Sequence, residues 1–176
     1  MLYHIDFSNN YTQKNFSVVA LVGSFEFNQK NEIFNKKNVK KAIVLEEPLR
    51  TKIINSYSIT KLHSILITFL IENLKDIKKI IICADVQPIE KVIEYLIKIN
   101  PQLNGKLTSI PHYREEIHNP KYKSEADAFA RSVNRNYKKR KNRHRRKKLF
   151  DDIPIITKKS ETSEDYKRLS KMISLL

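Results

Sequence analysis

The sequence predicts an α/β domain: a mixed five-stranded sheet with helices packed on its faces, in the order β-β-β-α-β-α-β-α. Short apolar runs between polar clusters occupy the first part of the chain, which is typical of strands joined as a meander. Farther along, apolar residues at helical spacing alternate with further apolar runs, which favours α/β crossovers. Hydrophobic residues make up 40% of the 176 positions, enough to bury the core of one domain.

Three early strands are expected, at residues 3–8, 16–23 and 41–46. The second of them is rich in valine and is bounded by polar clusters, as a buried strand is. Pro48 ends the third strand. The residues between the second and third strands give no clear prediction.

A change of period marks the later elements. A helix with Ser56 or Ser58 as its N-cap carries apolar residues at helical spacing as far as Leu74. The unbroken apolar run of residues 78–84 indicates a central strand covered on both faces. The remaining expected elements are a helix from Pro88 to Asn100, a short strand at residues 106–110, and a helix that contains Ser124–Arg131, with Ala126, Phe129, Ala130 and Val133 on its buried face.

The charge of the chain is unevenly distributed. A formal net charge of +15 indicates a polyanionic partner, nucleic acid first and an anionic membrane surface second. We divide the chain into a domain of residues 1–136 and a C-terminal part, residues 137–176, with a basic segment and a short helix. The basic segment holds Lys138, Lys139, Arg140, Lys141, Arg143, Arg145, Arg146, Lys147 and Lys148.

We expect little regular structure at the start of this C-terminal part and a helix at its end. Like charges four residues apart repel one another, so the basic segment should be extended or only partly helical. Tyr137 and Phe150 flank it and are candidates for stacking on bases. Residues 163–176 have helical apolar spacing and form a helix that could dock on the core or bind a protein partner.

Composition also excludes some classes of protein. Cys83 is the one cysteine, so an internal disulfide and a cysteine-rich zinc site are excluded, and we expect it to be a small core residue. The N-terminus becomes polar by residue 8, unlike a signal peptide. The longest apolar stretch, Ile65–Ile71, is too short to span a bilayer. We therefore expect a cytoplasmic protein with no membrane partner.

Three aspartates lie at the edges of different expected elements. Asp6 closes the apolar run that begins the first strand at Leu2, Asp85 closes the most apolar strand, and Asp127 lies in the first turn of the late helix. A carboxylate at the end of a buried strand is costly unless it is paired, and a divalent metal commonly pairs with several at once. Each aspartate alone also suits a turn or a helix N-terminus, so the set carries the argument for a metal site.

The order of elements and the three aspartates together resemble the ribonuclease H-like fold over residues 1–136. That family carries one carboxylate on the first strand, one at the end of the fourth strand and one on the last helix. Asp6 resembles the first, Asp85 the second, and Asp127 in Glu125-Ala-Asp-Ala-Phe-Ala-Arg131 the third. The sequence His118-Asn119-Pro120 is similar to the loop in which cellular members carry a mobile catalytic histidine.

The resemblance implies a phosphodiester hydrolase with Mg²⁺ or Mn²⁺ at Asp6, Asp85 and Asp127, and with His118 as a proton relay. It also exposes a departure. The family carries a glutamate in the first turn of its first long helix, where this chain has Lys61. Glu46, at the end of the third strand, is a candidate to supply the missing carboxylate if that strand ends beside Asp6.

Three functions from different classes follow from these observations. The first is a ribonuclease H-like nuclease that acts on an RNA–DNA hybrid or structured RNA. The second is a module with a lapsed site that binds RNA or DNA through its basic segment within a larger complex. The third is an interaction protein whose terminal helix binds a protein partner. Lys61 favours the second.

His63, on the first helix, is expected at the surface or its boundary rather than in a site.

Overall fold

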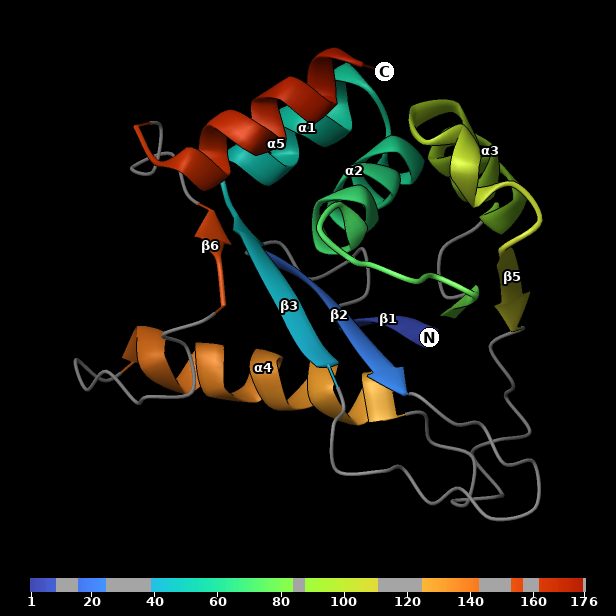
Figure 1. Cartoon of the computed structure of the whole chain (residues 1–176). Helices are drawn as coiled ribbons and strands as arrows, with labels where there is room; N and C mark the ends of the chain where they lie inside the picture. Colours follow the sequence, from blue (N-terminus) through green and yellow to red (C-terminus); the bar gives the residue numbers. More distant parts are fainter. Residues whose placement is uncertain are drawn as a thin grey trace.

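The computed structural model describes residues 1–8, 16–24, 39–83, 88–110, 125–142, 153–156 and 162–175. Its strands are β1 (Leu2–Ser8), β2 (Phe16–Ser24), β3 (Val39–Glu46), β4 (Lys79–Cys83), β5 (Leu107–Ile110) and β6 (Ile155–Ile156). Its helices are α1 (Leu49–Ser56), α2 (Ile59–Ile71), α3 (Ile89–Ile99), α4 (Glu125–Asn142) and α5 (Glu164–Ser174), with a 3₁₀ turn at Pro101–Leu103 (Figure 1).

The described strands form one mixed sheet of six strands in the order β5-β4-β1-β2-β3-β6. Strands β1, β2 and β3 are an antiparallel meander, whereas β4 runs parallel to β1 and β5 runs parallel to β4. The predicted α/β architecture is confirmed, but the strand count is six rather than five. The added strand, β6, pairs in parallel with Val44 and Leu45 and is two residues long, too short to leave a pattern in the sequence.

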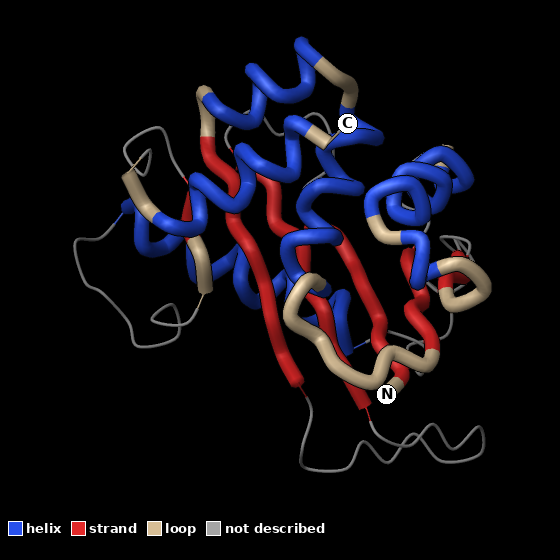
Figure 2. The backbone as a smooth tube through the Cα atoms, turned by 45° about the horizontal axis from the view of Figure 1, so that its top comes forward, coloured by secondary structure: helices blue, strands red, loops and turns tan. Residues whose placement is uncertain are grey.

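Helices cover both faces of the sheet, as predicted. Helices α1, α2, α3 and α5 lie on one face and α4 lies on the other (Figures 1 and 2). Because side chains alternate along a strand, Tyr3, Ile5 and Phe7 of β1 face α2 and its neighbours, where they join the larger hydrophobic cluster. His4 and Asp6 therefore point to the face that α4 covers.

The segment after β3 contains a helix that the sequence did not predict. Helix α1 follows directly after Pro48, and its buried residues are Leu49, Arg50 and Ile53. An arginine among so few apolar residues gives no apolar stripe, which explains why the pattern was missed. Helix α2 begins after Ser58, one of the two predicted N-caps, whose Oγ accepts a hydrogen bond from the backbone nitrogen of Lys61 at 3.2 Å.

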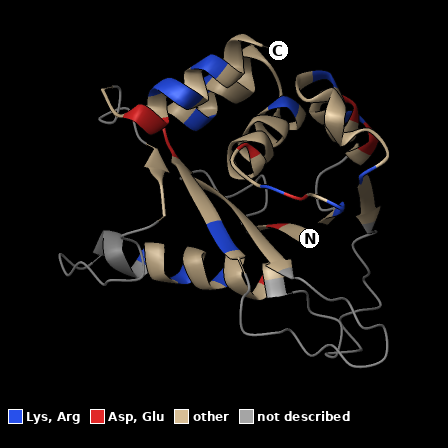
Figure 3. Cartoon of the chain, in the orientation of Figure 1, with Lys and Arg blue, Asp and Glu red and all other residues tan. Residues whose placement is uncertain are grey.

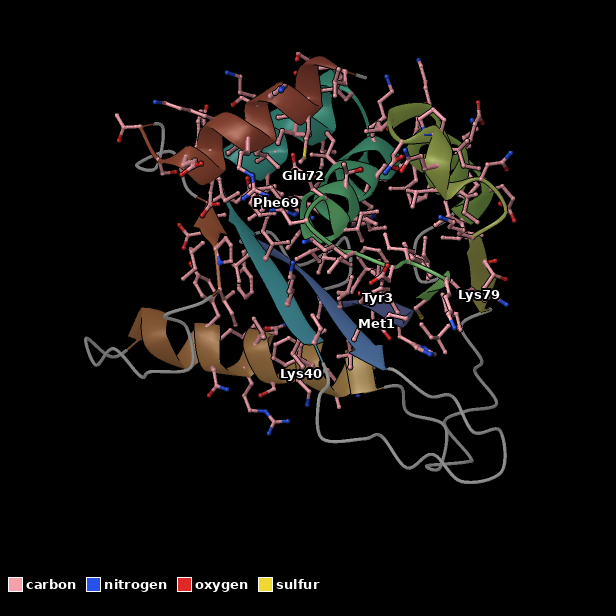
Figure 4. The ribbon with its side chains drawn as sticks, in the orientation of Figure 1. Met1, Tyr3, Lys40, Phe69, Glu72 and Lys79 are labelled. Atoms are coloured by element: carbon pink, nitrogen blue, oxygen red, sulfur yellow. The ribbon has the colours of Figure 1, made fainter. Side chains whose placement is uncertain are left out.

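The C-terminal helix α5 packs on α2. Its residues Leu169 and Met172 are buried in the larger hydrophobic cluster. Arg168 lies over the ring of Phe69, with 4.4 Å from its guanidinium carbon to the ring centroid, and donates to Glu72 at 2.7 Å. Figure 4 shows Phe69 on α2, and Glu72 directly after its end, beneath α5. The apolar face of the helix is therefore covered within the chain.

Helix α4 is longer than the sequence predicted. It runs to Asn142 and so includes the first five residues of the basic segment, which we expected to be extended or only partly helical. Its buried residues Ala130, Val133 and Tyr137 pack on β2 and β3. That packing anchors the helix and offsets the repulsion between its like charges. No helix in the described part of the chain is long and apolar enough to cross a membrane.

Gly23 of β2 is required by the ring of Tyr3, its partner on β1. A Cβ at this position would lie 2.5 Å from Cε1 of Tyr3, whose hydroxyl donates to Sδ of Met1 at 2.9 Å (Figure 4). We expect Gly23→Ala to lower the free energy of unfolding by about 1–3 kcal/mol in urea denaturation, because the ring must shift. In a Tyr3→Leu background the same change should cost less, and an equal cost would contradict this explanation.

Candidate functional site

Asp6 is a buried carboxylate in the middle of the sheet. It is 5% exposed and lies on the face that α4 covers. Its register partner on β2 is Ala20, which in turn pairs with Ala42 of β3. The two alanines let α4 approach the sheet beside the carboxylate. The backbone nitrogen of Phe7 donates to Oδ1 of Asp6 at 2.7 Å, which helps to offset the cost of burying the charge.

Asp127 lies in the first turn of α4, the helix that packs on β1 and β2. The positive end of the helix dipole stabilises a carboxylate in this turn. Its side chain is 17% exposed, and its Oδ1 accepts a hydrogen bond from Nε of Arg131, 58% exposed, at 2.6 Å. Asp6 and Asp127 thus lie on the same side of the sheet, on a strand and on the helix that covers it.

Asp85 and His118 lie outside the described residues. The strand that leads to Asp85 is described as far as Cys83, which is half-buried rather than a core residue. Ile5 of β1 pairs in parallel with Ile82 of β4, so Cys83 follows in the row of Asp6. The carboxyl ends of these two neighbouring strands therefore lie at the same edge of the sheet, the usual place for a ligand site in an α/β fold.

Glu46 is not brought to Asp6. It pairs with Phe16, whereas Asp6 pairs with Ala20, four residues away on the same strand β2. Four residues along the strand and two strands across place their Cα atoms about 16 Å apart at standard sheet dimensions. Magnesium binds its ligands at about 2 Å, so Glu46 and Asp6 cannot share one ion in this arrangement. Strand β3 ends beyond β1 rather than beside Asp6.

Lys61 is directed toward α3. Its Nζ lies 5.4 Å from the ring centroid of Tyr95 on α3 and 5.7 Å from that of Tyr57. Both distances are within the range of a cation–π interaction. Helix α2 packs on the face of the sheet opposite to the one toward which the side chain of Asp6 points.

A buried polar cluster that the sequence did not predict lies on the α2 side of the sheet. His63 is 6% exposed, not at the surface as predicted, and its ring lies 4.7 Å from that of Phe7 between centroids. Arg50 is also 6% exposed; it donates through Nε to Oγ of Ser17 at 2.7 Å and through Nη1 to Oε1 of Glu47 at 3.1 Å. The sequence gives only a weak signal of this, because apolar residues flank His63 while the polar residues Thr60, Ser64 and Thr68 of the same helix are buried as well.

Burial and charge set the ionisation of this cluster. Burial, with a smaller contribution from the positive charge of Arg50, lowers the pKa of His63 to about 3. Burial by itself raises the pKa of Glu47, but hydrogen bonds from Thr51 and Arg50 outweigh it, so the pKa of this carboxyl is lowered. The cluster therefore holds a neutral His63 beside a charged pair at neutral pH.

Basic side chains follow the outer side of α4. Arg131, Arg135 and Lys138 are exposed there, at intervals of four and three residues (Figure 3). Lys40 is exposed at the start of β3, on the face of the sheet that α4 covers (Figure 4). The backbone of Lys139, Arg140 and Lys141 continues the helix, and the rest of the basic segment, Arg143, Arg145, Arg146, Lys147 and Lys148, lies outside the described residues.

The sequence suggested that Tyr137 could stack on bases, but the structure shows that its ring is not available for that role. It is 4% exposed and packs edge-on against Phe16, with 4.6 Å between ring centroids. Helical continuation turns this residue inward, three positions after Asn134 on the buried side of α4. Phe150, the other proposed stacking residue, lies outside the described residues.

The donor set has the right chemistry for a hard divalent cation, since carboxylate oxygens are the ligands that Mg²⁺ and Mn²⁺ prefer. Within the described ranges no three His, Cys, Asp or Glu side chains are grouped closely enough to hold a metal, and Asp85 lies outside those ranges. No protein-family model, curated protein or solved structure matches this chain.

Proposed function

We propose that this chain is a ribonuclease H-like protein that binds nucleic acid and hydrolyses phosphodiesters of RNA, in an RNA–DNA hybrid or in structured RNA. One observation carries the proposal. A buried carboxylate, Asp6, points from the central strand of the sheet toward the helix that bears Asp127 in its first turn and basic side chains on its outer side. The meander followed by parallel crossover strands beside β1 supports the same assignment.

In this proposal Asp6, Asp85 and Asp127 hold Mg²⁺ or Mn²⁺, and His118 relays a proton. The ion, when bound, activates a water molecule and stabilises the leaving oxygen. The protein positions the carboxylates in two ways: the backbone nitrogen of Phe7 donates to Oδ1 of Asp6, and Nε of Arg131 donates to Oδ1 of Asp127 in the first turn of α4. The first support is a backbone group and orients its carboxylate before substrate binds.

The basic residues of α4 hold the substrate. Arg131, Arg135 and Lys138 extend from the turn that carries Asp127 toward the basic segment. Contacts of this kind are made to phosphates, carry little sequence information and weaken steeply as salt rises. A nucleic-acid backbone bound along this side of the helix would reach Asp127.

The test is cleavage of labelled RNA–DNA hybrid, duplex RNA and single strands with Mg²⁺ or Mn²⁺. We expect Asp6→Asn to reduce cleavage at least about a hundredfold, because an amide is a weaker ligand and cannot neutralise the cation. Glu46→Gln is the matched control and should retain activity, since Glu46 lies four residues away in register. Equal cleavage by Asp6→Asn and the unchanged protein contradicts the enzyme.

A module that binds RNA or DNA without cleaving it is the second candidate. It is favoured by Lys61, which stands in the first turn of α2, where the ribonuclease H-like family carries a glutamate, and whose ammonium lies near the rings of Tyr57 and Tyr95. Salt-dependent binding by the unchanged protein, with no cleavage of any substrate in either metal, would select this candidate over the nuclease.

A further inference from the structure

The ion pair between Asp127 and Arg131 joins a proposed metal ligand to the proposed substrate surface. The two side chains are one helical turn apart on α4, and Nε of the arginine lies 2.6 Å from Oδ1 of the aspartate. Arg131 is 58% exposed, so it can turn away from the helix surface at little cost. An ion pair with one partner this exposed is screened by solvent and is weak enough for a competing charge to break it.

A divalent cation at Asp127 is such a competitor. The carboxylate that accepts the hydrogen bond from Arg131 would also be a ligand for the cation, and two positive charges at one carboxylate repel each other. The exposed guanidinium is the group that is free to move. Once released, it stands at the end of the row that continues with Arg135 and Lys138, about 6 Å and about 10 Å farther along the helix axis.

We propose, on the basis of the function proposed above, that Arg131 is a positioning residue that exchanges partners. It pairs with Asp127 in the absence of a cation, and when a divalent cation takes Asp127 it moves to a phosphate of the nucleic acid. A guanidinium suits that second partner because its fork of N–H donors matches a phosphate. Cation and nucleic acid then bind cooperatively, and by thermodynamic linkage each strengthens the other by the same factor.

Two variants of the full chain separate this exchange from a general loss of charge. Arg131→Gln removes the residue that pairs with Asp127. Arg135→Gln removes an equal charge one turn farther on, where the side chain is exposed and forms no ion pair with another described residue. Two binding measurements are made on each protein: the affinity for Mn²⁺ alone, by electron paramagnetic resonance, and the affinity for a labelled RNA–DNA hybrid with and without Ca²⁺, by fluorescence anisotropy.

The exchange predicts opposite changes in Arg131→Gln. Its affinity for Mn²⁺ should rise about two- to fivefold, because a competitor for Asp127 is gone. Ca²⁺ should strengthen hybrid binding about fivefold or more in the unchanged protein and have little effect in this variant. Arg135→Gln should leave Mn²⁺ affinity unchanged and weaken hybrid binding by one factor whether Ca²⁺ is present or absent.

Each outcome either supports or contradicts the exchange of partners by Arg131. Opposite changes in Arg131→Gln support the exchange, since a structural role would not tighten cation binding. If Arg131→Gln behaves like Arg135→Gln while the unchanged protein binds both cation and hybrid, the exchange is wrong and the proposed function stands. If the unchanged protein binds neither Mn²⁺ nor hybrid, the proposed function is wrong and the exchange falls with it.

Discussion

Acidification from pH 7 toward pH 3 is expected to destabilise the protein strongly through His63. Burial, and to a smaller extent the charge of Arg50, lowers the pKa of His63 in the folded state to about 3, against 6.5 for an ordinary histidine. The unfolded chain therefore binds this proton more readily than the folded chain. The stability that the neutral ring contributes is full above about pH 6.5 and is lost as the pH falls through that window to about 3.

The size of the effect follows from the width of the window. Each pH unit between the two pKa values costs about 1.4 kcal/mol, so His63 alone accounts for about 4–5 kcal/mol across the whole range. That is comparable to the total stability of many domains. Carboxyl groups also titrate below about pH 5, so the contribution of His63 is best measured between pH 6.5 and 5. Burial lowers the pKa of His4 too, so the change in the free energy of unfolding over this interval must be compared between the unchanged protein and a variant that lacks His63.

The measurement is urea denaturation of the unchanged protein and of His63→Leu at several pH values from 7.5 to 5. Leucine has a similar size and should pack against Phe7 without titrating. Between pH 7 and 5 the unchanged protein should lose about 2 kcal/mol more than the variant. Parallel curves would show that the buried ring does not set the pH dependence.

The sequence predicted those elements whose burial is periodic. The predicted bounds of helix α2, helix α3 and the strand that contains Ile80 and Ile82 agree with the observed bounds to within a few residues. In each of them the spacing of the apolar residues is enough to identify the buried side of the element. Helix α1 and strand β6 were missed. The first buries Arg50 among few apolar residues, and the second exists only because β3 offers an open edge to Ile155 and Ile156.

The candidate site shows a similar division. Asp6 could be singled out from the sequence because a carboxylate interrupts an apolar strand, yet which face it points to depends on the packing of α4. Whether Glu46 could reach the site depends on the register of β3 against β2. The pattern of a single strand does not show which residues of the neighbouring strand lie opposite it. The charged neighbours of Tyr137 in sequence suggest a surface aromatic, whereas the helix period places its ring against Phe16.

Replacement of Arg50 by methionine is expected to lower the free energy of unfolding by about 3 kcal/mol. The guanidinium is almost fully buried and joins β2 to α1 through Ser17, at 2.7 Å, and Glu47, at 3.1 Å. Methionine keeps much of the volume but leaves the buried hydroxyl of Ser17 without the Arg50 donor and removes one of the donors to Glu47, whose carboxylate keeps the backbone nitrogen of Thr51. A buried polar group that loses its partner costs more than the hydrogen bond itself contributes.

Arg131→Met is the matched control, because it makes the same chemical change at a side chain that is 58% exposed and should alter stability by no more than about 0.5 kcal/mol in urea denaturation. Equal losses in the two variants would contradict a structural role for the buried cluster. Arg50→Met also tests the cause of the low pKa of His63. Since Arg50 contributes less than burial, its loss should raise that pKa only in part. The ring in the folded variant then stays neutral between pH 7 and 5, so the stability of Arg50→Met should depend on pH there about as steeply as that of the unchanged protein and more steeply than that of His63→Leu.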